Sequence, residues 1–139
     1  MRTIVAPLAA DVRAELDALP RRLRPIAQRY IQRLRLEPYL GAPAGRGLLA
    51  DHRCRRVYFD ASSKPDDLFG ASAVRARRGD QDPSEGPKWR IVYSVREAPN
   101  AGVRLVVILA IGEGHPAPGR RSAYELAEAR LRNLERRSR

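Results

Sequence analysis

Residues 88–96 read KWRIVYSVR, and the alternation in this stretch decides the kind of fold that the chain adopts. Every second position is apolar, which is the side-chain period of a β-strand. The apolar positions are Trp89, Ile91, Tyr93 and Val95. Their face is aromatic and aliphatic and belongs in a hydrophobic core. The opposite face carries Arg90, so this arginine is either a solvated charge on an open sheet face or a group aimed at a ligand.

Further strands are expected on both sides of this stretch. Residues 54–60 read CRRVYFD, and residues 103–111 are the most apolar run, so we expect that run at the centre of the sheet. A turn signal at 100–102 separates it from the strand with Arg90. Residues 2–6, RTIVA, predict a short opening strand.

Apolar residues at helical spacing lie before and after these strands. Two stripes near the N-terminus predict an antiparallel helical hairpin, and they consist of Leu8, Val12, Leu16 and Leu19, then Leu23, Ile26, Ala27, Tyr30, Ile31 and Leu34. Residues 122–125 read SAYE, a capping box that opens a last helix. The order β-α-α-β-β-β-α predicts one α+β domain over residues 1–139 with an antiparallel sheet. The hairpin would cover one sheet face and leave the other for function.

Residues 61–87 interrupt this pattern. They are rich in Ser, Asp, Gly and Pro, and their one short apolar patch is Leu68 and Phe69. We interpret the segment as a long, largely mobile insertion between two strands. We also expect it to be dispensable for folding.

The charge of the chain indicates an anionic partner. The formal net charge is +11, and almost all the basic residues are arginine, since Lys64 and Lys88 are the only lysines. The planar fork of arginine suits phosphate, so a nucleic acid is favoured over a membrane surface, although codon bias toward arginine is an alternative source. The single cysteine, Cys54, permits no internal disulfide. The N-terminus lacks a secretory h-region and no apolar run could span a bilayer, so we expect a cytoplasmic protein.

Three stretches together resemble the RelE/ParE superfamily of bacterial toxins over residues 1–60 and 88–135. They are GAPAGRGLL at 41–49, WRIVYSV at 89–95 and VVILAIG at 106–112, followed by a helix with Tyr124. The resemblance implies a helical hairpin before a curved antiparallel sheet. Its RelE-like branch implies the toxin of a type II toxin–antitoxin pair, an endoribonuclease that needs no metal or cofactor. Such an enzyme cuts mRNA on the ribosome by attack of the 2′-hydroxyl on the scissile phosphate.

Two other functions stay open on the same fold. A ParE-like toxin would inhibit DNA gyrase without RNA chemistry, and a third possibility is a non-catalytic nucleic-acid-binding module. In either toxin case the resemblance implies a cognate antitoxin protein as partner. No membrane partner is expected, and the sequence contains no metal-ligand spacing, P-loop or dinucleotide fingerprint.

The resemblance also implies which residues form the site. Arg90 falls on a strand arginine that contacts the scissile phosphate, and Arg56 falls on a basic residue of the preceding strand. Tyr124 falls on a tyrosine that stacks on a base or assists near the 2′-hydroxyl. These three form the expected catalytic set together with Arg121.

The expected RNA-binding residues are Arg55, Tyr58, Lys88, Arg120 and His115. Two departures from the family pattern affect the site. Tyr58 stands where the RelE type has a second lysine, which removes a charge. The register after the AIG motif is lost because EGHPAPG follows it at 113–119. A further basic group is expected there, and Arg120, Arg121 or His115 could supply it, with Arg121 favoured.

Overall fold

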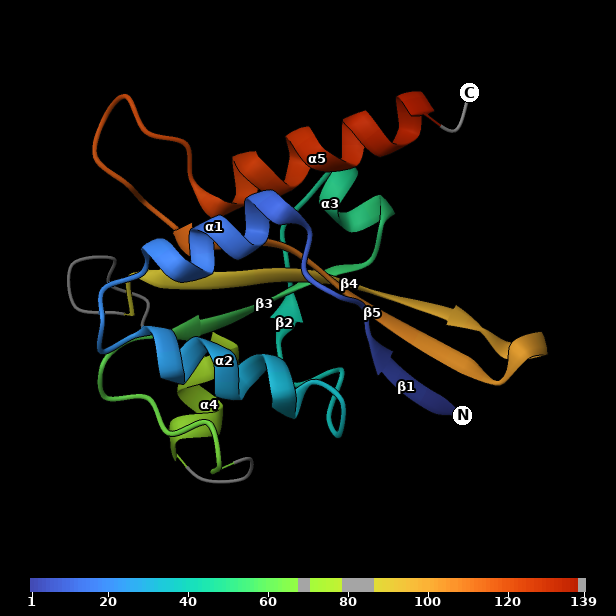
Figure 1. Ribbon diagram of the computed structural model, residues 1–139, viewed down its shortest axis with the longest axis horizontal. Coiled ribbons are helices and arrows are strands. Elements are labelled where there is room, and N and C mark those ends of the chain that lie inside the picture. Colours follow the sequence, from blue (N-terminus) through green and yellow to red (C-terminus); the bar gives the residue numbers. More distant parts are fainter. Residues whose placement is uncertain (68–70, 79–86, 138–139) are drawn as a thin grey trace.

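Within the residues that the structure describes, 1–67, 71–78 and 87–137, five strands form one sheet (Figure 1). The structure is a computed structural model. The strands lie in the order β1-β5-β4-β3-β2, and their bounds are β1 Arg2–Val5, β2 Ala42–Pro43, β3 Cys54–Phe59, β4 Trp89–Ala98 and β5 Val103–Glu113. Helices lie between and after these strands in the chain. The architecture is therefore α+β, as the sequence predicts.

The sheet is mixed, and the prediction of a purely antiparallel sheet is wrong. β1 pairs with β5 in parallel, with Ile4 opposite Leu105, whereas the pairs β5–β4, β4–β3 and β3–β2 are antiparallel. A tight turn would fix an antiparallel direction, but none joins β1 to β5, and side-chain alternation is the same in both directions. β5 is an inner strand, as expected, although β4 is the middle one.

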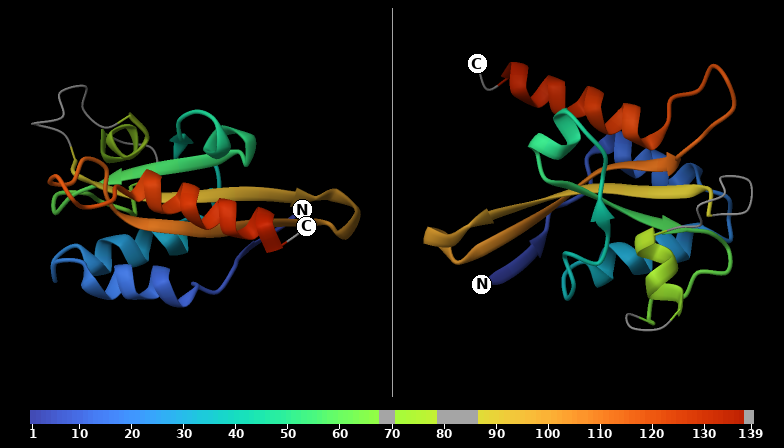
Figure 2. Two further views of the ribbon diagram at one scale, coloured as in Figure 1. Left: turned by 90° about the horizontal axis from the view of Figure 1, so that it is seen from above. Right: turned by 180° about the vertical axis from the view of Figure 1, so that it is seen from behind.

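The helices have bounds α1 Ala10–Ala18, α2 Arg24–Arg33, α3 Leu48–Asp51, α4 Ala71–Arg78 and α5 Ala123–Arg137. A short 3-10 helix, η1 Pro99–Ala101, joins β4 to β5 at the predicted turn. α1 and α2 form the predicted hairpin and lie together on one side of the sheet (Figure 2). Within the described part of the chain, no helix combines the length and the apolar character needed to cross a membrane.

The face of β4 that alternation predicts as apolar is buried against the hairpin. Ile91 and Tyr93 have no exposed surface. They belong to one hydrophobic cluster with Val12 and Leu16 of α1 and Tyr30 of α2. Each large apolar side chain buried in this way contributes about 1.5–3 kcal/mol. The predicted core face is therefore confirmed, and it attaches the hairpin to the sheet.

The opposite face is covered by α5, so the prediction of an open face is wrong there. Three α5 side chains are fully buried: Ala123, Ala127 and Leu131. They cluster with Val92 of β4 and Leu109 of β5. An amphipathic helix has to bury its apolar stripe, and this sheet face is the surface that the hairpin leaves available. Any site on this face must therefore lie at the margin of α5.

The predicted capping box forms at the start of α5. Ser122 Oγ accepts a hydrogen bond from the Glu125 backbone N–H at 3.1 Å, and Glu125 Oε1 accepts one from the Ser122 N–H at 3.1 Å. These bonds satisfy N–H groups that the first turn of a helix leaves without intrahelical partners. They also fix the position of Tyr124, which lies between the two capping residues in the chain.

β5 extends beyond the short β1, and side chains of α1 and α5 bond the backbone groups of β5 that β1 does not pair. Arg130 of α5 donates to the Leu109 carbonyl oxygen at 2.6 Å, and Glu15 of α1 accepts a hydrogen bond from the Ile111 N–H at 2.9 Å. Arg130 and Glu15 also form an ion pair with each other, and this hydrogen-bonded pairing raises the pKa of Arg130. An unpaired strand edge invites pairing with other chains. Glu15 and Arg130, which we call the edge bridge, cover this strand edge and join α1 to α5.

The loop before β3 is fastened to the core by Tyr93. Its hydroxyl donates to the Pro38 carbonyl oxygen at 2.8 Å and accepts from the Gly41 N–H at 3.0 Å. Burial raises the pKa of Tyr93 to about 12, so it stays a neutral donor. A Cβ on Gly41 would lie 2.5 Å from the Arg56 carbonyl oxygen. The glycine that opens the GAPAGRGLL motif is therefore required for this close approach to β3.

The segment 61–87 contains regular structure that the sequence does not predict. α4 packs against β3 and buries Ala73 and Ala76, and Arg75 of α4 pairs with Asp60 at 2.6 Å. The element order predicted from the sequence has no helix in this segment, and α4 was not predicted because small residues at helical spacing can bury a stripe without large apolar groups. The apolar patch at 68–69 and residues 79–86 lie outside the described residues. Mobility and dispensability of the segment stay predictions.

Candidate functional site

Four of the predicted site residues meet where β3, β4 and α5 come together. We call Arg56, Tyr58, Arg90 and Tyr124 the arginine–tyrosine cluster. Arg90 of β4 lies directly opposite Tyr58 of β3 in the strand register. Arg56 is two residues before Tyr58 and shares its sheet face. Tyr124 reaches the same place from the first turn of α5, so the cluster lies at the margin of that helix.

Arg90 is 7% exposed, and its neighbours hold the guanidinium in place. Nε donates to the Tyr124 hydroxyl at 3.0 Å, and Nη1 donates to the carbonyl oxygens of Pro87 and Trp89. The Tyr58 ring centroid lies 4.1 Å from Arg90 Cζ, which is a close cation–π contact. Arg90 is therefore not a solvated charge. Its Nη2 makes no hydrogen bond with the described residues and is the nitrogen left to contact a ligand.

A second guanidinium lies beside the same two rings. Arg56 Cζ is 5.1 Å from the Tyr58 ring centroid and 5.8 Å from that of Tyr124. Arg56 Nε is buried and makes no hydrogen bond with the described residues. Burial first, and then the neighbouring Tyr124 phenol, raise the pKa of Tyr58, which therefore keeps its proton at neutral pH. Tyr58 thus supplies no charge, but its ring contacts both guanidiniums.

The cluster is positively charged and has no internal counterion. Among the described residues, no carboxylate forms an ion pair with Arg56 or Arg90. Buried charges are normally paired because leaving them unpaired is costly. Phosphate is an anion whose geometry suits the arginine fork. The arrangement is therefore suited to binding a phosphate group against Arg90 Nη2 and Arg56.

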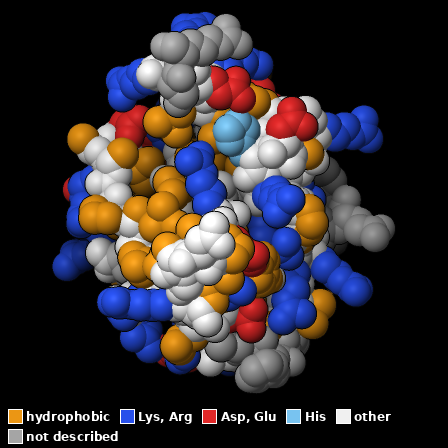
Figure 3. All heavy atoms as spheres, turned by 90° about the vertical axis from the view of Figure 1, so that its right-hand side faces the viewer, with side chains coloured by type: hydrophobic (Ala, Val, Ile, Leu, Met, Phe, Trp, Pro, Cys, Tyr) orange, Lys and Arg blue, Asp and Glu red, His pale blue; other side chains and the backbone are white. Residues whose placement is uncertain are grey.

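The positive charge of the chain is not confined to this cluster. Figure 3 shows one face of the molecule, on which Lys and Arg side chains are spread around a hydrophobic area. A net charge of +11 distributed in this way attracts nucleic acid at long range but does not specify where it binds. The local geometry of the cluster has to identify the site.

The further basic group that the sequence predicts after the AIG motif is not part of the arginine–tyrosine cluster. Arg120, Arg121 and His115 are exposed in the loop between β5 and α5, and their side chains make no hydrogen bond or ion pair with the described residues. Lys88 is exposed immediately before β4. These four residues make no hydrogen bond or ion pair that holds them against Arg90. The expectation that Arg121 completes the catalytic set is therefore not supported by a contact.

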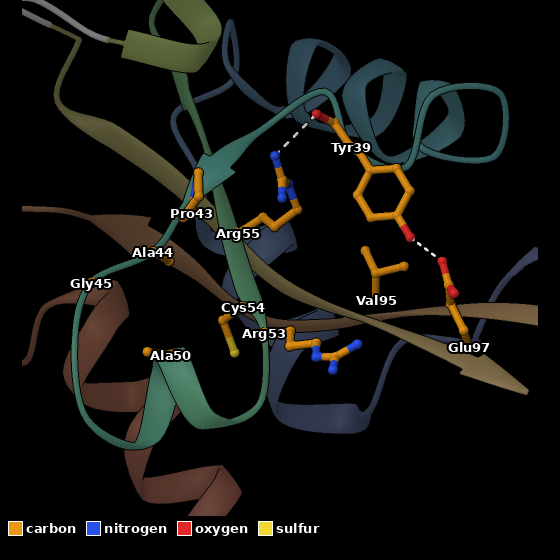
Figure 4. Close-up of a pocket in the computed structure, with 10 residues that line it drawn as sticks. All are labelled: Tyr39, Pro43, Ala44, Gly45, Ala50, Arg53, Cys54, Arg55, Val95 and Glu97. Carbon is orange, nitrogen blue, oxygen red and sulfur yellow. Dashed lines mark hydrogen bonds between the residues drawn. The ribbon is translucent and has the colours of Figure 1, made fainter.

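Arg55 lies on the opposite face from Arg56, as neighbouring residues of a strand must. Its Nε donates to the Gly41 carbonyl oxygen at 2.8 Å, and its Cζ is 5.3 Å from the Tyr39 ring centroid. It lines a separate pocket of about 350 Å³ at the end of β3 (Figure 4). Arg55 therefore cannot act together with Arg90 on one phosphate.

Two residues that position Arg90 are missed by sequence reasoning. One is Pro87, whose carbonyl oxygen accepts a hydrogen bond from Arg90. The other is Gly114, whose backbone passes so close that a Cβ would lie 2.8 Å from Arg90 Nε. The Gly114 N–H donates to the Lys88 carbonyl oxygen at 2.9 Å, which holds this backbone in place. The glycine following AIGE in the sequence was the available signal.

The chain matches no protein-family model, no curated protein and no solved structure. Among the described residues, no group of His, Cys, Asp and Glu side chains is placed to hold a metal ion. The class that the structure defines is an α+β protein with N-terminal helices, a mixed sheet and a C-terminal helix packed on the sheet. Function has to be argued from the arginine–tyrosine cluster and the motifs around it.

Proposed function

We propose that this protein is an endoribonuclease of the RelE type, the toxin of a type II toxin–antitoxin pair that cleaves mRNA on the ribosome. The observation that carries the proposal is the pair of guanidiniums, Arg56 and Arg90, around the Tyr58 ring without a carboxylate partner among the residues that the structure describes. A Tyr124 hydroxyl hydrogen-bonded to Arg90 at 3.0 Å stands beside them. The motif resemblance, which covers the strands that carry Arg56 and Arg90, supports the same conclusion.

The proposed reaction is attack of a ribose 2′-oxygen on the adjacent phosphorus. The P–O5′ bond breaks, and the products carry a 2′,3′-cyclic phosphate and a 5′-hydroxyl. Arg90 Nη2 and Arg56 stabilise the negative charge that grows on the phosphoryl oxygens. Because its oxygen already accepts from Arg90 Nε, the Tyr124 hydroxyl is oriented to donate a proton to the leaving 5′-oxygen. The 2′-hydroxyl proton passes to water.

The test is addition of the purified protein to a bacterial translation extract. We expect mRNA cleavage that depends on ribosomes and leaves 2′,3′-cyclic phosphate ends. A gyrase supercoiling assay run in parallel is expected to show no inhibition. Intact mRNA together with inhibited gyrase would overturn the proposal in favour of a ParE-like toxin.

A non-catalytic nucleic-acid-binding module is a second candidate, and the low exposure of Arg90 favours it. A guanidinium held by neutral oxygens at 7% exposure also suits a phosphate anchor that performs no chemistry. Salt-dependent RNA binding by the protein without any cleavage in the extract would support this candidate. Harmless expression of the chain alone in a bacterium would point the same way.

Replacing Gly114 by alanine is expected to reduce cleavage about 10- to 100-fold, because the added Cβ pushes the Arg90 guanidinium from its position. Because the displaced guanidinium is buried and hydrogen-bonded, we expect the melting temperature to fall as well, and the cleavage rate is compared for folded protein only. Gly112→Ala is the matched control, since its Cβ would meet the Ala123 Cβ at an ordinary 3.9 Å. Equal cleavage by both variants would show that Gly114 does not position Arg90.

An antitoxin partner belongs to the same proposal. The net charge of +11, together with two guanidiniums that no described carboxylate pairs, favours a partner with an acidic segment that covers the cluster. The open reading frame beside the gene for this chain is the place to look for it.

A further inference from the structure

The pocket at the end of β3 is a second concave site, distinct from the arginine–tyrosine cluster (Figure 4). Its volume of about 350 Å³ lies within the range of small-ligand sites, about 300–1,000 Å³. Apolar and small residues form part of its lining: Pro43, Ala44, Gly45, Ala50, Cys54 and Val95. Burial raises the pKa of Cys54 to about 11, so the thiol is neutral and acts as apolar surface.

Arg55 presents a fixed guanidinium to this pocket. Its Nε donates to the Gly41 carbonyl oxygen at 2.8 Å, and its Nη2 lies 3.4 Å from the Tyr39 carbonyl oxygen. Both acceptors are neutral, so the charge of Arg55 is not compensated by them. A guanidinium held by backbone oxygens is already oriented, and less side-chain entropy is lost when it binds an anion.

Glu97, the one carboxylate in the described lining of the pocket, is already engaged. It accepts hydrogen bonds from the Tyr39 hydroxyl and from Arg104 Nε, the latter at 3.3 Å. The bond from Tyr39, joined by Arg104 and by the charge of Arg53, lowers the pKa of Glu97. Arg104 therefore offsets the charge of Glu97. The charge left over in the pocket comes from Arg53 and Arg55 and is positive.

Arg53 is held in a conformation that its side chain does not favour. Its φ is +53°, in the left-handed region where glycine and asparagine are preferred. Arg53 follows the C-cap residue of α3, where a left-handed residue commonly ends a helix, and its backbone N–H donates to the Ala50 carbonyl oxygen at 2.9 Å. Figure 4 shows its guanidinium directed along the pocket toward the side of Glu97. Its side chain makes no hydrogen bond or ion pair with the described residues, so its donors are available to a ligand.

We propose that this pocket binds a nucleotide, with its phosphate on Arg53 and Arg55 and its base against the apolar wall that includes Val95. Both arginines line the pocket, and the neutral backbone oxygens that hold Arg55 leave its charge available to a phosphate. Cys54 in this pocket and Tyr58 in the cluster are four residues apart, about 13 Å along a strand. Whether the nucleotide is free or part of an RNA strand depends on the proposed function, but the phosphate chemistry is the same.

The test is calorimetric titration of the full chain with adenosine 5′-monophosphate and with adenosine. We expect the monophosphate to bind at least about tenfold more tightly, because adenosine lacks the group that the arginines recognise. Arg53→Gly is expected to weaken binding of the monophosphate at least about tenfold while the melting temperature stays the same or rises, since glycine fits the left-handed backbone. Arg21→Gly, which removes an exposed arginine outside the pocket, is expected to bind normally.

An Arg90→Ala variant separates this inference from the proposed function. It is expected to lose cleavage and keep binding of the monophosphate. Loss of binding in Arg90→Ala but not in Arg53→Gly would place the nucleotide in the cluster and overturn the inference, as would the absence of binding to the unaltered chain. Competition with a 2′-O-methyl RNA oligomer then identifies the source: displacement of the monophosphate indicates a nucleotide of an RNA strand, and no displacement indicates a free nucleotide.

Discussion

An Arg90→Ala variant is expected to cleave mRNA at least about 100-fold more slowly than the unaltered protein, a loss typical of removing one preorganised donor from a developing oxyanion. Arg90→Lys keeps the positive charge but cannot bond the Tyr124 hydroxyl and the Pro87 carbonyl oxygen at once. We therefore expect it to lose about 10- to 100-fold, since the planar fork and not charge alone holds the geometry. The measurement is the cleavage rate at saturating ribosome-bound mRNA.

The control for Arg90 has to separate lost chemistry from lost folding. Arg90 is buried, so each variant needs a thermal unfolding curve, and only folded protein enters the rate. Arg22→Ala removes an exposed arginine from the link between α1 and α2 and is expected to cleave within about twofold of the unaltered protein. Full cleavage by folded Arg90→Ala would remove this residue from the site.

Glu15→Ala is expected to cause a clear loss of stability at a position outside both sites. Glu15 pairs with Arg130 and accepts the Ile111 N–H at 2.9 Å, and its side chain is only 19% exposed. Removing it leaves the Ile111 N–H without its acceptor and takes one of two carboxylates from Arg130, which keeps Asp11 at 2.8 Å and the Leu109 carbonyl oxygen, at a cost of about 2–4 kcal/mol. For a chain of this size the melting temperature should fall by about 6–16 °C. Thermal and urea unfolding measure both quantities.

The exposed pair of Glu128 and Arg132 provides the matched control. These residues are one helical turn apart on α5, and their atoms lie 3.6 Å apart with side chains 35% and 59% exposed. Solvent screens such a pair, so Glu128→Ala is expected to cost less than about 1 kcal/mol. Similar losses for Glu15→Ala and Glu128→Ala would show that the edge bridge contributes no more than a surface ion pair.

Much of this fold follows from local sequence signals. Alternation in the stretch with Ile91 and Tyr93 predicts the buried face, and helical spacing around Leu16 and Tyr30 predicts the hairpin that covers it. The capping box at Ser122 predicts the start of the last helix. The parallel direction of β1 and the docking of α5 could not be predicted, because no tight turn links those elements to their partners. Both depend on which surfaces the rest of the chain leaves exposed.

The candidate site also contains residues that the sequence predicts and residues that it does not. Strand alternation places Arg56 and Tyr58 on one face, and the resemblance adds Arg90 and Tyr124. The glycine at 114 is visible in the sequence, but its contact with Arg90 could not be predicted, because it depends on a backbone that bends back over the guanidinium. The pocket could not be predicted for a similar reason: Arg53 lies immediately before β3 and Glu97 lies in β4, and only the pairing of these two strands brings them together.

The position of Tyr124 determines when, during synthesis of the chain, the site is completed. The cluster takes two arginines and a tyrosine from β3 and β4, but its fourth member belongs to α5, which follows every strand in the chain. Domains fold as their segments emerge from the ribosome, N-terminal parts first. A growing chain that has exposed its whole sheet therefore still lacks the hydroxyl that orients Arg90. On the proposed function, a ribosome that synthesises this protein is not exposed to a complete nuclease until the last helix has docked.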